Sequence, residues 1–158
     1  MSVLNYKLYY FLGVGGIGMS ALARYFNHYG KKVVGYDKTK TDLTKQLESE
    51  GIACHYEDDL ALLKSLITAY ATAEVLVIYT PAVPSENKEL NYLRDNHYDV
   101  LKRSAVLGEI TKQFKTIAIA GTHGKTTTTT MVAHILKHSG VNCFAFMGGC
   151  LLYTSRCV

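Results

Sequence analysis

The chain has 158 residues, of which 48% are hydrophobic and 19% are charged, and its formal net charge is +4. A charge this small is typical of an ordinary solvated surface, so we expect no nucleic-acid partner and no membrane partner. No apolar run reaches the roughly eighteen residues that a membrane span needs, and no signal-peptide pattern opens the sequence, so we expect a cytoplasmic protein.

The first predicted unit is a strand at residues 7–12, a glycine turn and a helix. The turn, Gly13-Val14-Gly15-Gly16-Ile17-Gly18, matches the pattern G-x-G-x-x-G. Asp37 closes the next strand, residues 32–36, about twenty residues after the turn, where an acidic residue meets the ribose in dinucleotide sites. We expect this turn to bind a diphosphate; a tight βα turn without a ligand is the alternative.

Helices and strands continue to alternate as far as residue 115. A helix around Leu43 and Leu47, which Gly51 ends, precedes a strand at 52–56 and a helix beginning at Asp58 or Asp59. A strand at 74–79, a loop at 80–84, a helix capped by Ser85, a strand at 99–101 and a helix at 104–114 follow. Such alternation produces parallel pairing through right-handed crossovers. The pattern predicts an α/β fold with a Rossmann-like, doubly wound parallel sheet.

A second glycine-containing turn lies between a predicted strand at 116–119 and a helix with an apolar stripe at 131–136. It reads Ala120-Gly121-Thr122-His123-Gly124-Lys125-Thr126-Thr127. Backbone N–H groups in such a turn surround phosphate, the lysine reaches the β- and γ-phosphates, and the Thr126 hydroxyl can bind Mg²⁺. Ile119 stands where the commonest P-loop has its first glycine. His123 either contacts the nucleotide or fills a variable position.

These motifs together resemble the Mur ligase family of peptidoglycan synthesis, and within it the L-alanine-adding branch. The resemblance runs from Lys7 to Gly149. The resemblance rests on four segments: the turn at 13–20, Tyr79-Thr80-Pro81-Ala82-Val83, Lys102-Arg103-Ser104 with Leu107-Gly108-Glu109, and the stretch at 118–129.

The resemblance implies a division of the chain. Residues 1–106 would form a UDP-sugar-binding Rossmann-like domain, and residues 107–149 the truncated start of a P-loop ATPase domain, the family's central ATP-binding domain. Residues 150–158 depart from the family pattern, and we expect them to be a foreign or frame-shifted tail. We expect such a fragment to be inactive alone.

The resemblance also implies an activity, the ATP-dependent ligation of L-alanine to UDP-N-acetylmuramate through an acyl phosphate, with Mg²⁺ as cofactor. Lys125 would be catalytic, stabilising charge on the transferring phosphoryl group, and Thr126 would ligate Mg²⁺. The ATP-binding residues would be Gly121, Thr122, His123, Gly124, Lys125, Thr126 and Thr127. The UDP-sugar-binding residues would be Gly13, Gly15, Gly16, Ile17, Gly18, Met19, Ser20, Asp37, Thr80 and Arg103.

Two other functions remain open from the sequence. One is an NAD-binding redox or sensor module built on Gly13, Gly15, Gly18 and Asp37, which leaves the second turn without a role. The other is a non-catalytic nucleotide-binding protein that is complete at this length. One strand, one helix and one more strand, expected at 141–147, cannot bury a core after residue 115, which weighs against the second.

Overall fold

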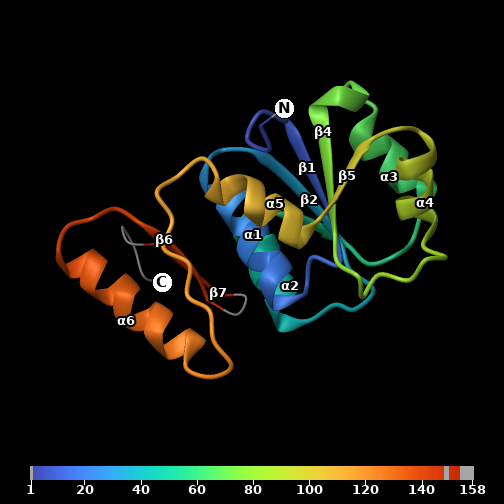
Figure 1. The fold of residues 1–158 in the computed structure, drawn as a ribbon. Helices are drawn as coiled ribbons and strands as arrows, with labels where there is room; N and C mark the ends of the chain where they lie inside the picture. The colour runs from blue at the N-terminus through green and yellow to red at the C-terminus, as the bar shows by residue number, and fades with distance from the viewer. Residues whose placement is uncertain (1, 148–149, 154–158) are drawn as a thin grey trace.

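The computed structural model describes residues 2–147 and 150–153. Five parallel strands form one sheet, in the order β3-β2-β1-β4-β5, and two antiparallel strands, β6 and β7, form another (Figure 1). The strands are β1 (Leu8–Leu12), β2 (Lys32–Tyr36), β3 (Ala53–His55), β4 (Val75–Tyr79), β5 (Asp99–Lys102), β6 (Phe144–Met147) and β7 (Cys150–Tyr153). The helices are α1 (Ile17–His28), α2 (Asp42–Ser49), α3 (Leu60–Ile67), the short 3-10 helix η1 (Thr72–Glu74), α4 (Lys88–Asp95), α5 (Arg103–Thr111) and α6 (Lys125–His138).

Strand β1 is the centre of the large sheet. Tyr10 lies opposite Val34 of β2 on one side and Val77 of β4 on the other. All five β1 residues are fully buried, as expected for a parallel strand that helices cover on both faces. The predicted α/β fold with a Rossmann-like parallel sheet is therefore confirmed.

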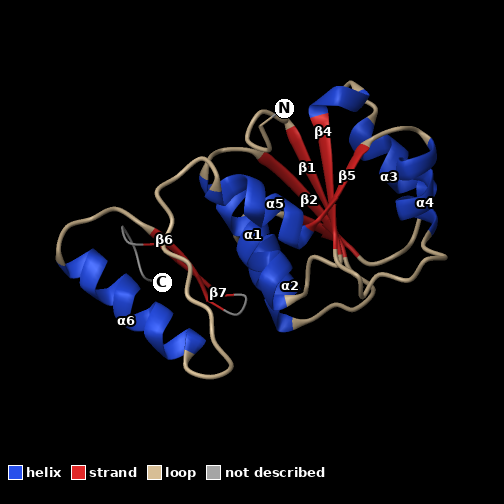
Figure 2. Cartoon of the chain, viewed as in Figure 1, coloured by secondary structure: helices blue, strands red, loops and turns tan. Residues whose placement is uncertain are grey.

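Helices α1, α2 and α5 lie on one side of the five-stranded sheet, and α3 and α4 lie on the other (Figure 2). Because successive side chains of a strand point to opposite faces, Tyr9 and Phe11 join one core with α1, α2 and α5, whereas Leu8, Tyr10 and Leu12 join the other with α3 and α4. Helix α5 contributes Val106 and Ile110 to the first core. The domain boundary expected near residue 107 therefore falls inside a helix that packs on the first sheet.

One expected helix start differs from the structure, and another, at Asp58 or Asp59, is confirmed. Asn87, not Ser85, caps α4, because its Oδ1 accepts a hydrogen bond of 2.7 Å from the Leu90 amide. Asp59 caps α3, accepting a 2.8 Å bond from the Ala61 amide, while the Asp58 carboxylate reaches across to the start of α4. Several element bounds also differ from those expected by one to three residues, as is usual at frayed ends.

The strand predicted at residues 116–119 is wrong: this stretch is extended chain without strand pairing. Ile117 is 64% exposed. A parallel strand needs a neighbouring strand for its backbone groups. Within the described residues β6 and β7 pair only with each other, so this stretch has no strand hydrogen-bonded to it.

The β6–β7 hairpin lies between α1 and α6 in Figure 1. Its Phe144 and Phe146 rings stand 5.4 Å and 5.8 Å from the Tyr25 ring of α1. Of the tail expected at 150–158, residues 150–153 form β7, and residues 154–158 lie outside the described residues. In the described part of the chain, no helix combines the length and hydropathy that crossing a membrane requires.

Candidate functional site

A cavity of about 680 Å³ opens at the carboxyl ends of β1, β2 and β4. The strand order reverses direction at β1, and open α/β sheets bind their ligands in the crevice at such a switch point. Of the expected UDP-sugar residues, the cavity wall includes Gly13, Gly15, Gly16, Asp37 and Thr80. The wall also includes Tyr36, Lys38, Asp58, Ala82, Val83, Pro84, Glu86 and Asn87.

The glycine turn is held tightly against the ends of two strands. The amides of Gly13 and Val14 both donate to the carbonyl oxygen of Tyr36, at 2.8 Å and 3.0 Å. Gly13 has a φ of 86°, and a Cβ there would lie 2.6 Å from the Thr80 methyl carbon. A side chain at position 13 would therefore be strained and would push Thr80 into the cavity.

Asp37 meets the glycine turn directly. Its Oδ2 accepts a 2.8 Å hydrogen bond from the Gly15 amide, and its Oδ1 accepts a 3.0 Å bond from the Thr39 amide. A Cβ on Gly15 would lie 2.8 Å from that Oδ2 and 3.0 Å from a Thr44 methyl carbon. The structure thus places Asp37 at the cavity, as expected, but it also pairs the Gly15 amide with a carboxylate.

The start of α1 leaves two amides available. In the part of the chain that the structure describes, the amides of Ile17 and Gly18 donate to no acceptor. Arg103, the first residue of α5, lies beside them: a Cβ on Gly18 would be 2.9 Å from its Nη1. No described residue forms a hydrogen bond or ion pair with this guanidinium. Two amides, a helix N-terminus and a cation therefore gather at one point, which favours an anion.

Two residues expected at the site face inward instead. Met19 is buried in the core beside α1, and its amide donates to the Gly16 carbonyl oxygen at 3.0 Å. The Ser20 hydroxyl, also buried, donates to the Ile17 carbonyl oxygen at 2.9 Å. Both support the turn from behind. Their side chains do not line the cavity.

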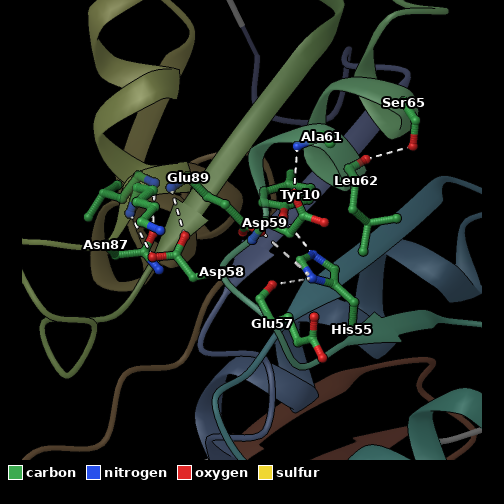
Figure 3. Close-up of polar contacts among 12 residues, drawn as sticks. Tyr10, His55, Glu57, Asp58, Asp59, Ala61, Leu62, Ser65, Asn87 and Glu89 are labelled. Carbon is green, nitrogen blue, oxygen red and sulfur yellow. Dashed lines mark hydrogen bonds and ion pairs between the residues drawn. The ribbon is translucent and has the colours of Figure 1, made fainter.

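A buried polar cluster lies behind the cavity wall (Figure 3). The Tyr10 hydroxyl of β1 is 2.6 Å from Oε2 of Glu89 on α4 and 2.7 Å from Nε2 of His55 on β3. Oε1 of Glu89 accepts a 3.2 Å hydrogen bond from the Asp59 amide. Burial raises the pKa of Glu89 to about 7 and lowers the pKa of His55.

The sequence pattern predicts neither this cluster nor most of the cavity wall near α4. The Asp58 carboxylate accepts hydrogen bonds from the amides of Lys88 and Glu89, at 2.8 Å and 3.0 Å, which joins the loop after β3 to the first turn of α4. One signal was available: Glu89 precedes Leu93 by four positions, so a carboxylate occupies the apolar stripe of α4.

The second glycine turn is exposed from Gly121 to Thr128. Gly124, with a φ of 77°, precedes the first residue of α6, so Lys125 begins that helix as expected. The Lys125 ammonium donates to the carbonyl oxygens of Gly121 and Thr122, at 2.6 Å and 3.1 Å. The turn, its lysine and a helix N-terminus are thus together, which is the arrangement that binds phosphate.

Similarity to known proteins decides the family. A sequence model described as "Mur ligase family, catalytic domain" matches residues 8–115. The chain belongs to the Mur ligase family. The predicted resemblance is therefore confirmed.

Named relatives agree with this assignment. The chain is 54% identical over 149 residues to the UDP-N-acetylmuramate–L-alanine ligase of Cytophaga hutchinsonii, covering 94% of this chain and 32% of the relative. The crystal structure of the UDP-N-acetylmuramate-alanine ligase MurC of Thermotoga maritima matches with a TM-score of 0.72 and 34% identity, covering 89% of this chain and 31% of that one.

A second solved structure, the murein peptide ligase mpl of Psychrobacter arcticus, matches with a TM-score of 0.77 and 30% identity, covering 90% of this chain and 28% of that one. The chain thus spans about a third of the length of the curated relatives that it matches.

Proposed function

We propose that this chain provides the UDP-sugar site and the phosphate loop of an ATP-dependent ligase that joins L-alanine to UDP-N-acetylmuramate. The observation that carries the proposal is the cavity at the switch point of the sheet, whose wall combines the glycine turn with Asp37 and Thr80. Family membership and the similarity to L-alanine ligases support it. We place the UDP-sugar domain at residues 1–106 and the start of the ATP-binding domain at 107–149, in the cytoplasm.

The proposed reaction overcomes the poor electrophilicity of a carboxylate. A carboxylate oxygen of UDP-N-acetylmuramate attacks the γ-phosphorus of ATP, the bond to the β-phosphate oxygen breaks, and ADP leaves. The amine of L-alanine then attacks the carbonyl carbon of the acyl phosphate, inorganic phosphate leaves, and the nitrogen loses a proton. The protein contributes positioning and charge neutralisation.

Residues of the cavity wall and residues at the start of α1, which lie next to that wall but do not line it, suit the two ends of a uridine diphosphate differently. The free amides of Ile17 and Gly18, with Arg103 beside them, are suited to the diphosphate. Asp37 is suited to a ribose hydroxyl, because a carboxylate accepts hydrogen bonds that hydroxyls donate. Burial raises the pKa of the Tyr36 phenol, and the carboxylates of Asp58, Glu89 and Asp37 raise it further, so this phenol stays neutral and can donate to the ligand.

The second turn is suited to ATP. Lys125 would leave the carbonyl oxygens of Gly121 and Thr122 to neutralise the transferring phosphoryl group, and the amides of 121–127 would bind the phosphates. The hydroxyl of Thr126, a hard oxygen donor in the first turn of α6, would be one ligand of a Mg²⁺ ion. When bound, Mg²⁺ would neutralise phosphate charge.

Calorimetric titration of the chain with UDP-N-acetylmuramate, UDP and NADH tests the first site. We expect both uridine nucleotides to bind and NADH to bind far more weakly. The Gly15→Val variant should lose uridine binding, because its Cβ would displace the Asp37 carboxylate. Gly108→Val is the matched control, since a Cβ on Gly108 meets no atom within 4 Å. Micromolar NADH binding without uridine binding would establish the redox or sensor module instead.

A further inference from the structure

The buried cluster behind the cavity wall has one hydroxyl hydrogen for two close neighbours. The Tyr10 hydroxyl has a single hydrogen, yet it is within hydrogen-bond distance of both Glu89 Oε2 and His55 Nε2. His55 Nδ1 lies 3.1 Å from the Glu57 carbonyl oxygen, which only accepts, so Nδ1 carries a hydrogen. A second hydrogen is therefore needed between Tyr10 and its two neighbours.

Two arrangements provide that hydrogen, and they hold the same number of protons. In one, Glu89 is a neutral acid that donates to the Tyr10 oxygen, and Tyr10 donates to a neutral His55. In the other, His55 is an imidazolium that donates to Tyr10, and Tyr10 donates to an ionised Glu89. The Glu89 side chain is fully buried and that of His55 is 10% exposed, so the neutral arrangement costs less desolvation.

Removing this proton breaks the cluster. Two lone pairs would then face one hydroxyl hydrogen at 2.6 Å and 2.7 Å, so one of these contacts would lose its hydrogen bond. The new carboxylate charge would also face Asp58 and Asp59, whose nearby carboxylates already disfavour ionisation of Glu89. The phenol of Tyr36 of β2 also lies beside the cluster, with its ring 5.4 Å from that of His55.

The cluster is connected to two segments of the cavity wall. Glu89 accepts from the Asp59 amide, which fixes the loop at 57–59, and Asp58 in that loop binds the amides of Lys88 and Glu89. Asp58, Glu86 and Asn87 line the cavity. The loop after β3 and the first turn of α4 are therefore held to each other and to β1 through Glu89 (Figure 3).

We propose that Glu89 is a positioning residue of the cavity: with Tyr10 and His55 it holds one shared proton, and that proton keeps the loop at 57–59 and the start of α4 in place for the ligand. Loss of the proton loosens this wall and weakens binding. The inference depends on the proposed function only for the ligand used to test it, a uridine diphosphate.

Calorimetric titration with UDP between about pH 6 and about pH 8.5 tests the proposal, because this range spans the loss of the shared proton. Glu89→Gln reproduces the protonated acid: its amide nitrogen donates to Tyr10 and its amide oxygen accepts from Asp59. Wild type should lose about tenfold more UDP affinity across the range than Glu89→Gln. UDP itself titrates here, so the two proteins are compared at each pH.

Two more variants distinguish a positioning role of Glu89 that depends on the shared proton from a purely structural role. Glu57→Gln removes a carboxylate from the same loop on an exposed residue and should keep the wild-type pH profile. Glu89→Ala should bind UDP weakly at every pH, since it has no group for Tyr10 or Asp59. Parallel pH profiles for wild type and Glu89→Gln would overturn the proposal.

Failure of UDP to bind would contradict the proposed function and leave this inference to be tested without ligand. Two measurements make that test. Hydrogen exchange of peptides covering 57–59 and 86–89 should accelerate with pH more in wild type than in Glu89→Gln. A carbon NMR titration of the wild-type Glu89 carboxyl addresses the case in which Glu89→Gln does not fold. A midpoint near that of an ordinary exposed glutamate would overturn the proposal, and one near neutrality would support it.

Discussion

The five-stranded sheet and the segment after α5 differ in how far their apolar residues are buried. Ile78 of β4 is fully buried, whereas Met131 and Ile135 on α6 are 59% and 62% exposed. Helix α6 is fourteen residues long and regular, yet the only residue it buries among those described is Ala133. The local sequence is therefore sufficient to form the phosphate turn and its helix. A packed core also needs a central strand that has a neighbouring strand on each side.

The largest expected effect is the difference in how much an isoleucine-to-alanine substitution lowers the free energy of unfolding in the two regions. Ile78→Ala should lower the free energy of unfolding by about 3–4 kcal/mol, because it leaves a cavity in a packed core. Ile135→Ala should change it by less than about 0.5 kcal/mol. Urea unfolding followed by circular dichroism measures both. Equal costs would mean that α6 is packed in solution.

The second expected effect is a pH dependence of stability in the part of the chain that contains the five-stranded sheet. Glu89 has its pKa raised from 4.5 to about 7, so the folded chain keeps a proton that the unfolded chain releases. The stability that this proton contributes is complete below about pH 4.5 and is lost as pH rises through 7. Glu89→Gln should therefore gain about 3 kcal/mol on wild type across that interval.

Denaturant unfolding at several pH values gives this difference directly. The lowered pKa of His55 affects stability in the opposite direction, with a cost that disappears as pH rises, and His55 is present in both proteins. The Glu57→Gln protein is the control for loss of a carboxylate. A constant difference between Glu89→Gln and wild type would show that Glu89 is ionised in the folded state.

A smaller effect concerns the cap of α4. Asn87→Ala should cost about 1 kcal/mol, because the Leu90 amide loses its acceptor at a buried position. Ser85→Ala, at the residue that the sequence pattern favoured, should cost a few tenths at most, since its hydroxyl only contacts the neighbouring Glu86 carboxylate. Thermal unfolding of both variants compares them, and the reverse order would restore the sequence-based cap.

The smallest effect on stability is expected at the exposed turn. Lys125→Ala should change the free energy of unfolding by less than about 0.5 kcal/mol, because its ammonium bonds only to exposed carbonyl oxygens. It should nevertheless abolish binding of a fluorescent ATP analogue, if the chain binds one, whereas Lys115→Ala should not. A Lys125→Ala protein that binds the analogue as well as the parent would contradict the proposed role of this lysine.

The parts of the site that follow from local pattern were predictable from the sequence. The glycine turn, Asp37 and Thr80 each end a strand of one parallel sheet, so topology brings them to one edge. Asp58 and Asn87 were not predictable as cavity residues, because their positions depend on how the loop after β3 packs against α4. The strand at 116–119 was predicted wrongly because its apolar pattern specifies a strand only when a neighbour is present.

The central position of β1 also has a consequence for biosynthesis. Leu8 pairs with Lys32 on one side, but its partner on the other side is Val75, far later in the chain. At a ribosome's pace of about 5–20 residues per second, roughly 3–13 seconds separate the synthesis of Leu8 from that of Val75. During that interval one edge of a strand made only of leucine, tyrosine and phenylalanine lacks its partner, and such edges pair readily with other chains. We expect the nascent chain to depend on a chaperone until β4 has emerged.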